Sequence, residues 1–398
     1  MNVLAVLHYS VFRGPPSCIL RLSGPLAEKG VNLTVVLPDE DGDSAERFTS
    51  AGVPIERIRL RRVRASLNPL HHVKLLAGLP GDVNRLRRII RRRNADVVIL
   101  TGLANPHGAL AAHRENRAVL WQIVDSRVPA AGRRALMPLV ERRSDAVMFW
   151  GEAVKRLHTN GRALEIPAFL ASSPVDLAQF TPSTERRLAT RADLEIPPDA
   201  PVVGTVSNLN PQKGVEYFIR AARRIADEVD SARFLVVGAR YSTHRSYSAR
   251  LEAELRAVGL ADRLTFAGSV RKVEDYYPAM DVKLITSVPG SEGIPTTALE
   301  AMACGVPVVT TDVGSAAEAV VDGVTGYVVP PRDEDAIASA ALRILTQPQL
   351  GSQLGQNGRR RAEERYGLGP AADTHMRALQ SAIEHHGQRR GAPTWAVT

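Results

Sequence analysis

The sequence of 398 residues predicts two α/β domains, each built on a parallel β-sheet covered by helices. Apolar runs of four to six residues alternate with stretches of helical period along the whole chain, which is typical of parallel sheets. The length exceeds what one ordinary hydrophobic core holds, so two domains are expected. The same alternation starts again after residues 170–200, a segment rich in Pro, Ser and charge.

The first half contains short apolar runs that we predict as strands at 2–7, 32–37, 96–100, 118–124 and 145–149. A helix is predicted from about Cys18 to Lys29, ending at Gly30 because glycine readily takes the left-handed conformation that closes a helix. The stretch from Val83 to Arg93 carries apolar residues on one side and Arg on the other. We interpret it as a helix packed on its own sheet, not as a membrane-binding helix.

The second half repeats this plan. Its predicted strands lie near 201–206, 233–237, 263–267, 282–286, 306–310 and 326–328. Its predicted helices lie at 214–229, 245–258, 296–303, 315–320 and 333–346, with a last helical stretch from about 370 to 386. Residues 388–398 have the composition of a frayed terminus.

The formal net charge of +9 is concentrated in residues 1–182, which hold 26 Lys and Arg against 16 Asp and Glu. The Arg clusters at 59–64 and 85–93 could bind nucleic acid or an anionic membrane. Lys occurs only 6 times, so the Arg content also fits the codon usage of a GC-rich genome. Aromatic residues do not interleave with the Arg clusters, and we therefore expect no nucleic-acid partner.

The sequence holds no run of 18 or more apolar residues, so we expect no membrane span. The segment Met1–His8 lacks a basic leader and a cleavage site, and we predict a strand there, not a signal peptide. The two cysteines, Cys18 and Cys304, lie far apart and have no metal-ligand spacing. Buried, reduced thiols in a cytoplasmic protein are the expectation.

Two acidic residues eight positions apart, Glu292 and Glu300, are the most informative feature of the chain. One is predicted on a loop and the other on the first turn of the helix that follows. The N–H groups at a helix N-terminus attract phosphate oxygens, and the carboxylates could accept hydrogen bonds from a sugar and a ribose. Thr297 and Glu300 also fit a capping box, with Glu292 a solvated loop acid. Lys213, before Gly214 at another predicted helix start, favours a nearby anion because a cation there is otherwise unfavourable.

The second half resembles glycosyltransferase family 4, whose members move a sugar from a nucleotide donor and retain its anomeric configuration. The resemblance is carried by the order and spacing of short segments, each of which is weak alone. They are Val202–Val206, Asn208–Gly214, Phe234–Gly238, Leu264–Gly268, Glu292–Glu300, Gly305–Val309, Gly314, Glu318 and Gly323–Gly326. Pro174–Asp176 and Phe180–Pro182 resemble the short motif at the family's interdomain crossing.

This resemblance implies the GT-B fold, in which two Rossmann-like doubly wound domains face across a cleft. The expected acceptor domain covers 1–182, a linker covers 183–200, and the donor domain covers 201–369. The last helix, about 370–387, is expected to pack back on the first domain, as in the family.

The resemblance also implies the roles of individual residues, with Glu292 on the hydroxyls of the donor sugar, Glu300 on the ribose and Lys213 on the diphosphate. The catalytic group is then Glu292, Lys213 and Asp125. The donor-binding group is Gly14, Asn208, Lys213, Val270, Arg271, Glu292, Gly293, Ile294, Pro295, Thr296, Thr297 and Glu300. Backbone atoms near Val270 and Arg271 would contact the base, so the nucleotide, UDP or GDP, is not specified by side chains.

The chain departs from the family pattern at two positions. Asn208 stands where the family usually has an arginine, so Asn208 contacts the phosphate weakly or Arg13, Arg240 or Arg271 supplies the missing charge. Val124 stands where a histidine commonly ends the strand. Asp125 and His107 are therefore the tentative acceptor-binding residues, with a capping or loop role as the alternative for His107.

The predicted function is a retaining, hexosyltransferase-like reaction on a small-molecule or glycan acceptor that is polar and soluble. Neither a cofactor nor a metal is expected, because Lys213 and helix N–H groups can hold the phosphate. Asp41 and Asp43 have Asp-x-Asp spacing, which we interpret as a solvated loop. The alternatives are a lipid-linked acceptor with peripheral membrane contact, a sugar-nucleotide epimerase or hydrolase, and a non-catalytic nucleotide-sugar binder.

Overall fold

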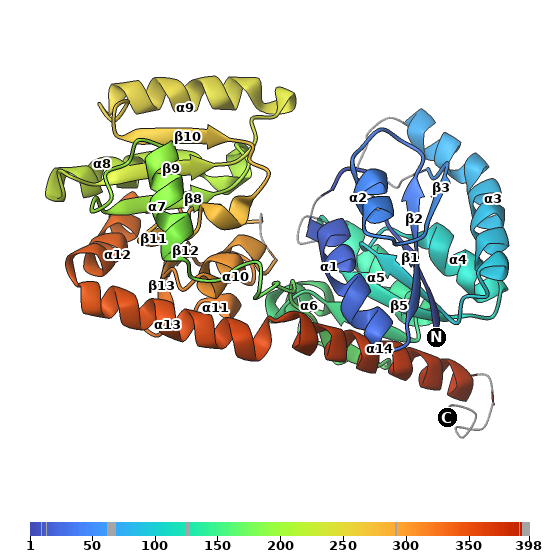
Figure 1. The fold of residues 1–398 in the computed structure, drawn as a ribbon. Helices are drawn as coiled ribbons and strands as arrows, with labels where there is room; N and C mark the ends of the chain where they lie inside the picture. The colour runs from blue at the N-terminus through green and yellow to red at the C-terminus, as the bar shows by residue number, and fades with distance from the viewer. Residues whose placement is uncertain are drawn as a thin grey trace. The chain divides into compact units, whose positions relative to one another are not determined.

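The computed structural model of the chain describes residues 1–8, 10–12, 14–61, 69–124, 128–290, 293–389 and 391. The chain divides into two compact units. Unit 1 is Met1–Pro174 together with Leu368–Thr398, and unit 2 is Val175–Gly367. Each unit is an α/β domain around one parallel sheet, which confirms the predicted fold class (Figure 1).

Unit 1 has, within its described residues, a seven-stranded parallel sheet in the order β3-β2-β1-β4-β5-β6-β7. The strands are β1 (Asn2–Val6), β2 (Asn32–Pro38), β3 (Ile55–Ile58), β4 (Val97–Thr101), β5 (Ala118–Ile123), β6 (Ala146–Phe149) and β7 (Ala168–Leu170). Successive side chains of a strand point to opposite faces. Val3 and Ala5 of β1 therefore join one buried cluster, while Leu4 and Val6 join another. Both faces of the sheet are buried, as a continuous apolar strand predicts.

The helices of unit 1 cover both faces of this sheet (Figure 1). They are α1 (Gly14–Glu28), α2 (Ser44–Ser50), α3 (Pro69–Arg92), α4 (Pro106–Arg114), α5 (Ala130–Arg143), α6 (Glu152–Thr159) and α14 (Leu368–Arg389). Although α14 is the last helix in the sequence, it packs against α1, β5 and β6. Lys29 and Asp373 form an ion pair of 2.7 Å between α14 and the end of α1.

Unit 2 has, over the residues described there, a six-stranded parallel sheet in the order β10-β9-β8-β11-β12-β13. The strands are β8 (Val202–Val206), β9 (Arg233–Val237), β10 (Leu264–Gly268), β11 (Val282–Ile285), β12 (Val308–Thr311) and β13 (Gly326–Val329). The helices are α7 (Thr184–Asp193), α8 (Val215–Glu228), α9 (Arg245–Ala257), α10 (Thr296–Ala303), α11 (Ala316–Ala319), α12 (Glu334–Thr346) and α13 (Pro348–Arg365). Three short 3-10 turns are η1 (Pro211–Lys213), η2 (Ser242–His244) and η3 (Val273–Asp275).

The segment expected to be a linker, 183–200, is folded into unit 2, and the boundary between the units lies at Pro174. Ser183 caps α7 by accepting a hydrogen bond of 3.1 Å from the N–H of Arg186. The guanidinium of Arg191 is buried and bonds to three backbone carbonyls and to Asp281. The bonds to Ala279 and Asp281 join residues 88 and 90 positions apart, so local composition alone did not reveal that the segment is anchored.

Some elements differ from their predicted bounds. Helix α1 begins at Gly14 and not at Cys18, because Pro15 and Pro16 fit the first turn of a helix, where no N–H partner is needed. Helix α3 extends over Pro69–Arg92 with Pro80 inside it. The short edge strands β3 and β7 and the helix α13 were not predicted. Within the described residues, no helix is both long and apolar enough to cross a membrane.

Each sheet reverses its strand order beside its first strand, between β1 and β4 in unit 1 and between β8 and β11 in unit 2. Ligands of open parallel sheets bind outside the carboxyl ends of the strands at such a point. In unit 2 the two loops concerned are 207–214, which contains η1, and 286–295, which leads into α10. Both predicted phosphate-binding segments therefore leave the same position in the sheet.

Candidate functional site

The place between β8 and β11 where the strand order reverses is the switch point of unit 2. The two loops that leave the sheet there are bonded to each other. The hydroxyl of Thr286 donates to the carbonyl oxygen of Lys213 over 3.0 Å. The N–H of Val288 donates to the carbonyl oxygen of Gln212, also over 3.0 Å. The side chain of Asn210 caps η1 by accepting the N–H of Gln212. The structure thus brings the backbone of Lys213 against the loop that leads into the predicted sugar- and ribose-binding segment.

Gly214 makes this contact possible. Its φ of +58° lies in the left-handed region, and a Cβ added there would stand 2.2 Å from the carbonyl oxygen of Thr286. A side chain of any kind would push the two loops apart. The glycine after Lys213 therefore has a steric role that the sequence pattern alone does not reveal.

The first N–H group of α8 is already occupied. The hydroxyl of Tyr247, on α9, accepts the N–H of Val215 over 3.0 Å and donates to the carboxylate of Glu216. Burial, followed by the bond to Glu216, raises the pKa of Tyr247 well above its usual range. The start of α8 is thus capped by protein groups.

The start of α10 is different. Its N-cap is Pro295, with φ −70° and ψ 110°, and Pro295 itself makes no side-chain cap hydrogen bond. Thr296 and Thr297 are the first two residues of the helix, at the positive end of its dipole. Thr297 is not the N-cap, and the capping box that Thr297 and Glu300 could have formed is absent from the described residues. Gly293 and Ile294 lead directly into this helix end.

Glu300 lies in the second turn of α10 and is 5% exposed. Its Oε2 accepts a hydrogen bond of 2.7 Å from the hydroxyl of Tyr277, which is itself fully buried. A buried carboxylate needs such partners, because leaving it unpaired in an apolar environment is costly. The residue is therefore held at a fixed place beneath the N-terminus of α10 and not on the protein surface.

Asn208, the first departure from the family pattern, is bonded to the loop that follows β9. Asn208 follows β8, and its Oδ1 accepts the N–H of Ala239 over 3.3 Å. Arg240, a proposed substitute cation, pairs with Glu252 and stacks on Phe266 at 5.1 Å. Arg240 is therefore engaged elsewhere, which removes it as the first choice for the missing charge.

Arg271 and Val270 follow β10 at the same edge of the sheet, with Arg271 exposed and Val270 partly buried against the apolar cluster. Arg271 and Arg240 are both described and exposed, but Arg240 is paired with Glu252, so Arg271 is the first choice to replace the family arginine. Arg13 lies outside the described residues, as do Glu292 and Asp125, so the predictions for these residues remain sequence-based.

In unit 1, Gly14 begins α1 directly after the loop that follows β1. His107 lies in the first turn of α4, but its ring is only 1% exposed. Its Nε2 is 3.9 Å from the buried carboxylate of Asp82. Burial lowers the pKa of His107, and the charge of Asp82 only partly offsets this. The structure therefore places His107 in the interior, where it cannot touch an acceptor without a change in conformation.

The acidic loop after β2 is a support for the loop after β1. Asp43 accepts the N–H of Phe12 over 2.8 Å, and Ser10 donates its hydroxyl to the carbonyl oxygen of Asp41 over 2.9 Å. Burial raises the pKa of Asp43, but the bonds from Phe12 and Arg47 outweigh it, so the pKa lies below its usual value. The described residues contain no cluster of three metal-ligating side chains. Asp43, whose side chain is 45% exposed, is thus a solvated loop acid that also has a structural role.

The Arg cluster at 85–93 is partly neutralised. Glu115 pairs with Arg87 and Arg91, at 2.6 and 2.5 Å. Glu56 pairs with Arg92 and Arg93, at 2.6 Å in each case. Hydrogen bonding to Arg91 is the main reason that the pKa of Glu115 is lowered. Part of the positive charge of this Arg cluster is therefore paired with carboxylates within unit 1.

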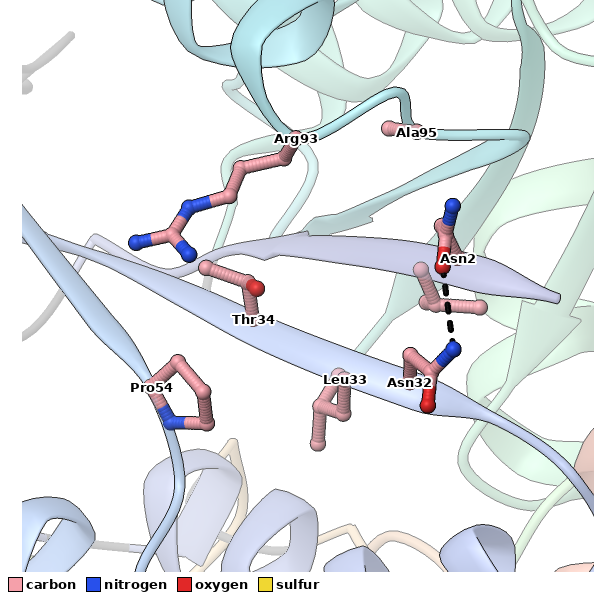
Figure 2. Close-up of a pocket in the computed structure, with 8 residues that line it drawn as sticks. Asn2, Asn32, Leu33, Thr34, Pro54, Arg93 and Ala95 are labelled. Atoms are coloured by element: carbon pink, nitrogen blue, oxygen red, sulfur yellow. Dashed lines mark hydrogen bonds between the residues drawn. The ribbon is translucent and has the colours of Figure 1, made fainter.

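Unit 1 has a cavity of about 230 Å³ at the amino ends of β1 and β2, the end of these strands opposite to the one where the strand order reverses into loops (Figure 2). Asn2, Asn32 and Thr34 line it from the first residues of β1 and β2, with Arg93 beside them. Parallel strands bind ligands at their carboxyl ends, and this cavity is at the amino ends. The guanidinium of Arg93 is already paired with Glu56. The chemistry thus points to the loops of unit 2 and not to this cavity.

Residues 200–347 match the family described as Glycosyl transferases group 1. The matched residues lie within unit 2 and include all six strands of its sheet. The chain is 31% identical to the lipopolysaccharide core biosynthesis mannosyltransferase LpcC of Rhizobium leguminosarum, over 57% of this chain and 62% of that protein. It is 29% identical to LpsB of Rhizobium meliloti, over 61% of this chain and 66% of that protein. The chain thus spans less than two thirds of the length of these two relatives.

A longer match, over 73% of this chain and 77% of the relative, is 28% identical. That relative is the GDP-mannose-dependent alpha-(1-6)-phosphatidylinositol monomannoside mannosyltransferase of Mycolicibacterium smegmatis. Among solved structures, the UDP complex of Anabaena Alr3699/HepE has a TM-score of 0.82 at 20% identity, covering 96% of this chain and 100% of that one. Sucrose-phosphate synthase of Thermosynechococcus elongatus has a TM-score of 0.75 at 21% identity, covering 94% and 97%. These likenesses show that the chain has the GT-B fold.

Several residues of the candidate site in unit 2 were not predicted from the sequence. Tyr277 lies in a turn, Thr286 follows β11, and Tyr247 lies in α9. Their partners are 23, 73 and 31 or 32 residues away in the sequence. No local spacing records such pairs, so only the fold reveals them.

Proposed function

We propose that the chain is a retaining, metal-independent glycosyltransferase of family 4. It transfers a hexose from a nucleoside diphosphate donor to a hydroxyl of a polar acceptor. The bond between the anomeric carbon and the diphosphate oxygen breaks, and a bond from that carbon to the acceptor oxygen forms. The acceptor's proton passes to the leaving diphosphate. No cofactor takes part, because the nucleotide-sugar is itself a substrate.

The observation that carries this proposal is the arrangement at the switch point of unit 2. The backbone of Lys213 is bonded to the Thr286–Val288 segment, and the same loop leads into the N-terminus of α10. Backbone N–H groups at a helix start bind phosphate, and cations or dipoles stabilise a leaving diphosphate. Lys213 and the N–H groups of Thr296 and Thr297 therefore hold the diphosphate in the proposed complex.

The proposed donor site extends above and below this phosphate position. Glu300, buried in α10, accepts hydrogen bonds from the ribose hydroxyls. Glu292 binds the hydroxyls of the donor sugar, and the backbone near Val270 contacts the base. Arg271 supplies positive charge where Asn208 replaces the usual arginine. UDP and GDP both remain possible nucleotides, since relatives and fold neighbours include a GDP-mannose-dependent enzyme and a UDP complex.

The acceptor is assigned to unit 1, with Asp125 as its first polar contact. The internal pairing of Arg87, Arg91, Arg92 and Arg93 supports a polar, soluble acceptor, because these side chains are partly neutralised before any membrane is met. A lipid-linked acceptor is the second candidate, and a relative named for a phosphatidylinositol mannoside favours it. The two free, buried cysteines support a reducing, cytoplasmic setting.

A donor and acceptor screen tests the proposal. UDP-glucose, UDP-N-acetylglucosamine and GDP-mannose are each incubated with the chain and with soluble sugars, inositol phosphate or phosphatidylinositol vesicles, and nucleoside diphosphate release is measured. We expect release that depends on an acceptor and a product with the donor's anomeric configuration by NMR. Inversion would contradict the retaining mechanism. Release without any acceptor would point to a hydrolase, and binding without release would point to a nucleotide-sugar binder.

A further inference from the structure

The ribose-binding residue of the proposed donor site depends on a second side chain. The carboxylate of Glu300 is attached through three rotatable bonds, and the last of these has a broad energy profile. A carboxylate that must meet two ribose hydroxyls therefore needs an external contact to fix its plane. The hydroxyl of Tyr277 provides that contact at 2.7 Å, a short distance typical of a hydrogen bond to a charged acceptor.

We propose that Tyr277 is a positioning residue for nucleoside recognition, which it achieves by orienting the Glu300 carboxylate toward the ribose. This inference rests on the proposed function, because it concerns the same donor site. Tyr277 does not touch the nucleotide. One carboxylate oxygen accepts from Tyr277, and since an ionised carboxylate offers about four acceptor positions, capacity remains for the ribose hydroxyls.

The ring of Tyr277 is held firmly enough for this role. It is fully buried and packs edge-to-face on Phe180, with ring centroids 5.9 Å apart and an interplanar angle of 65°. Aromatic pairs at this separation and tilt are favourable beyond the area that they bury. The hydroxyl therefore has little freedom to leave Glu300.

The backbone on both sides of Tyr277 is also fixed, by the segment that the sequence suggested was a linker. Thr190 donates its hydroxyl to the carbonyl oxygen of Asp275 over 3.0 Å. Arg187 and Arg191 donate to the carbonyl oxygens of Pro278 and Ala279, each over 3.1 Å. Helix α7 thus clamps the turn that carries Tyr277. Residues 180–191 thereby support the donor site although none of them is assigned a contact with the nucleotide.

The test compares ribonucleotides with their 2′-deoxy forms. UDP, GDP and ADP are titrated by calorimetry against the unaltered chain, and the diphosphate that binds is then compared with dUDP, dGDP or dADP. We expect the Tyr277→Phe variant to lose most of the preference for the ribose form, on the order of tenfold, because a hydrogen bond to a charged group is removed. A purely structural role would weaken both forms equally and leave their affinity ratio unchanged.

Tyr276→Phe is the matched control, because it removes the same atom one position away from a partly buried side chain. It should leave the ratio unchanged. Glu300→Ala should abolish the preference, and adding Tyr277→Phe to it should have no further effect on the ratio, as expected for two residues acting as a unit. Thermal unfolding checks that each variant is folded.

The outcomes separate the two proposals. If Glu300→Ala keeps the ribose preference, or if none of the three diphosphates binds the unaltered chain, the proposed donor site is wrong and this inference fails with it. If Glu300→Ala loses the preference while Tyr277→Phe retains it, the donor site stands and the positioning role of Tyr277 is refuted.

Discussion

Replacing Gly214 with alanine should separate the two loops of the donor site. The new Cβ would lie 2.2 Å from the carbonyl oxygen of Thr286, and the backbone there has φ +58°. To restore an ordinary contact the loops must move apart by roughly 1 Å. This movement would lengthen the bonds that join Thr286 to Lys213 and Val288 to Gln212, now 3.0 Å each.

Gly214→Ala should have two effects, a loss of stability from backbone strain and a loss of rate from the displaced loops, and a control variant can separate them. A left-handed backbone costs a non-glycine residue about 1–2 kcal/mol, and a misplacement of about 1 Å near a reacting centre can cost roughly a hundredfold in rate. Gly259 has φ +68°, and no described atom outside its own chain neighbours lies within 4 Å of a Cβ built there. Gly259→Ala therefore carries the backbone penalty without the collision.

Urea unfolding and nucleoside diphosphate titration of both variants give the assay. Both should lose about 1–2 kcal/mol of stability from backbone strain, with Gly214→Ala losing more. Only Gly214→Ala should also bind the diphosphate more weakly and transfer the sugar more slowly. Equal affinity in the two variants would refute the reasoning that the loop contact shapes the donor site.

Four further predictions follow from other parts of the chain. Arg191→Met should lower the unfolding free energy by about 1–3 kcal/mol, since it leaves three backbone carbonyl oxygens without the guanidinium donor while Arg187 still pairs with Asp281, whereas Arg224→Met on the surface should not. Burial lowers the pKa of His375 in the folded chain below the ordinary value of about 6.5, so the unfolded chain takes up the proton first as the pH falls. The free energy of unfolding should therefore decrease below about pH 6.5, by up to about 1.4 kcal/mol per pH unit. Urea unfolding of His375→Gln should show a flatter dependence on pH. Glu56→Gln with Glu115→Gln should increase salt-sensitive sedimentation with anionic liposomes, by releasing the Arg side chains that they pair, and unchanged binding would argue that those pairs do not mask the surface. Transferase activity should survive EDTA, and loss with rescue by Mn²⁺ would return attention to Asp41 and Asp43.

Sequence periodicity predicted the fold class well because strand burial is a local property. The core strands β1, β4, β8 and β11 are mostly apolar, and each was predicted within about two residues of its observed bounds. The edge strands β3 and β7 were missed. β7 has three residues, two of them exposed, so neither length nor apolar pattern distinguishes it from a loop.

The position of the candidate site could be predicted as far as it depends on the order of strands and loops along the chain. Lys213, Gly214, Thr296 and Glu300 follow strands whose carboxyl ends meet at one edge of the sheet, so their gathering was expected from topology. The side chains that hold these residues in place could not be predicted in this way. Tyr277 contacts Glu300 from a turn 23 residues earlier, and α7 supports that turn from 85 to 91 residues away. Such tertiary contacts leave no periodic signal.

Charge counts were the least informative feature of the sequence. The cluster at 85–93 suggested a basic surface, yet Glu56 and Glu115, which pair with four of its arginines, are 24 to 37 residues distant from them. Likewise, Asp43 looked like a solvated loop acid and proved to bind the backbone of Phe12. In both cases the partner comes from a different loop or helix, which composition cannot identify.

Hydrogen exchange measured by mass spectrometry, with and without a saturating nucleoside diphosphate, tests the central claim most directly. Our account places the diphosphate between η1 and the start of α10. Binding should therefore slow exchange in peptides covering 209–217 and 286–300, and Lys213→Ala should reduce the effect in both. Protection confined to residues 2–34 and 93–95 of unit 1, or no protection at the start of α10, would contradict it.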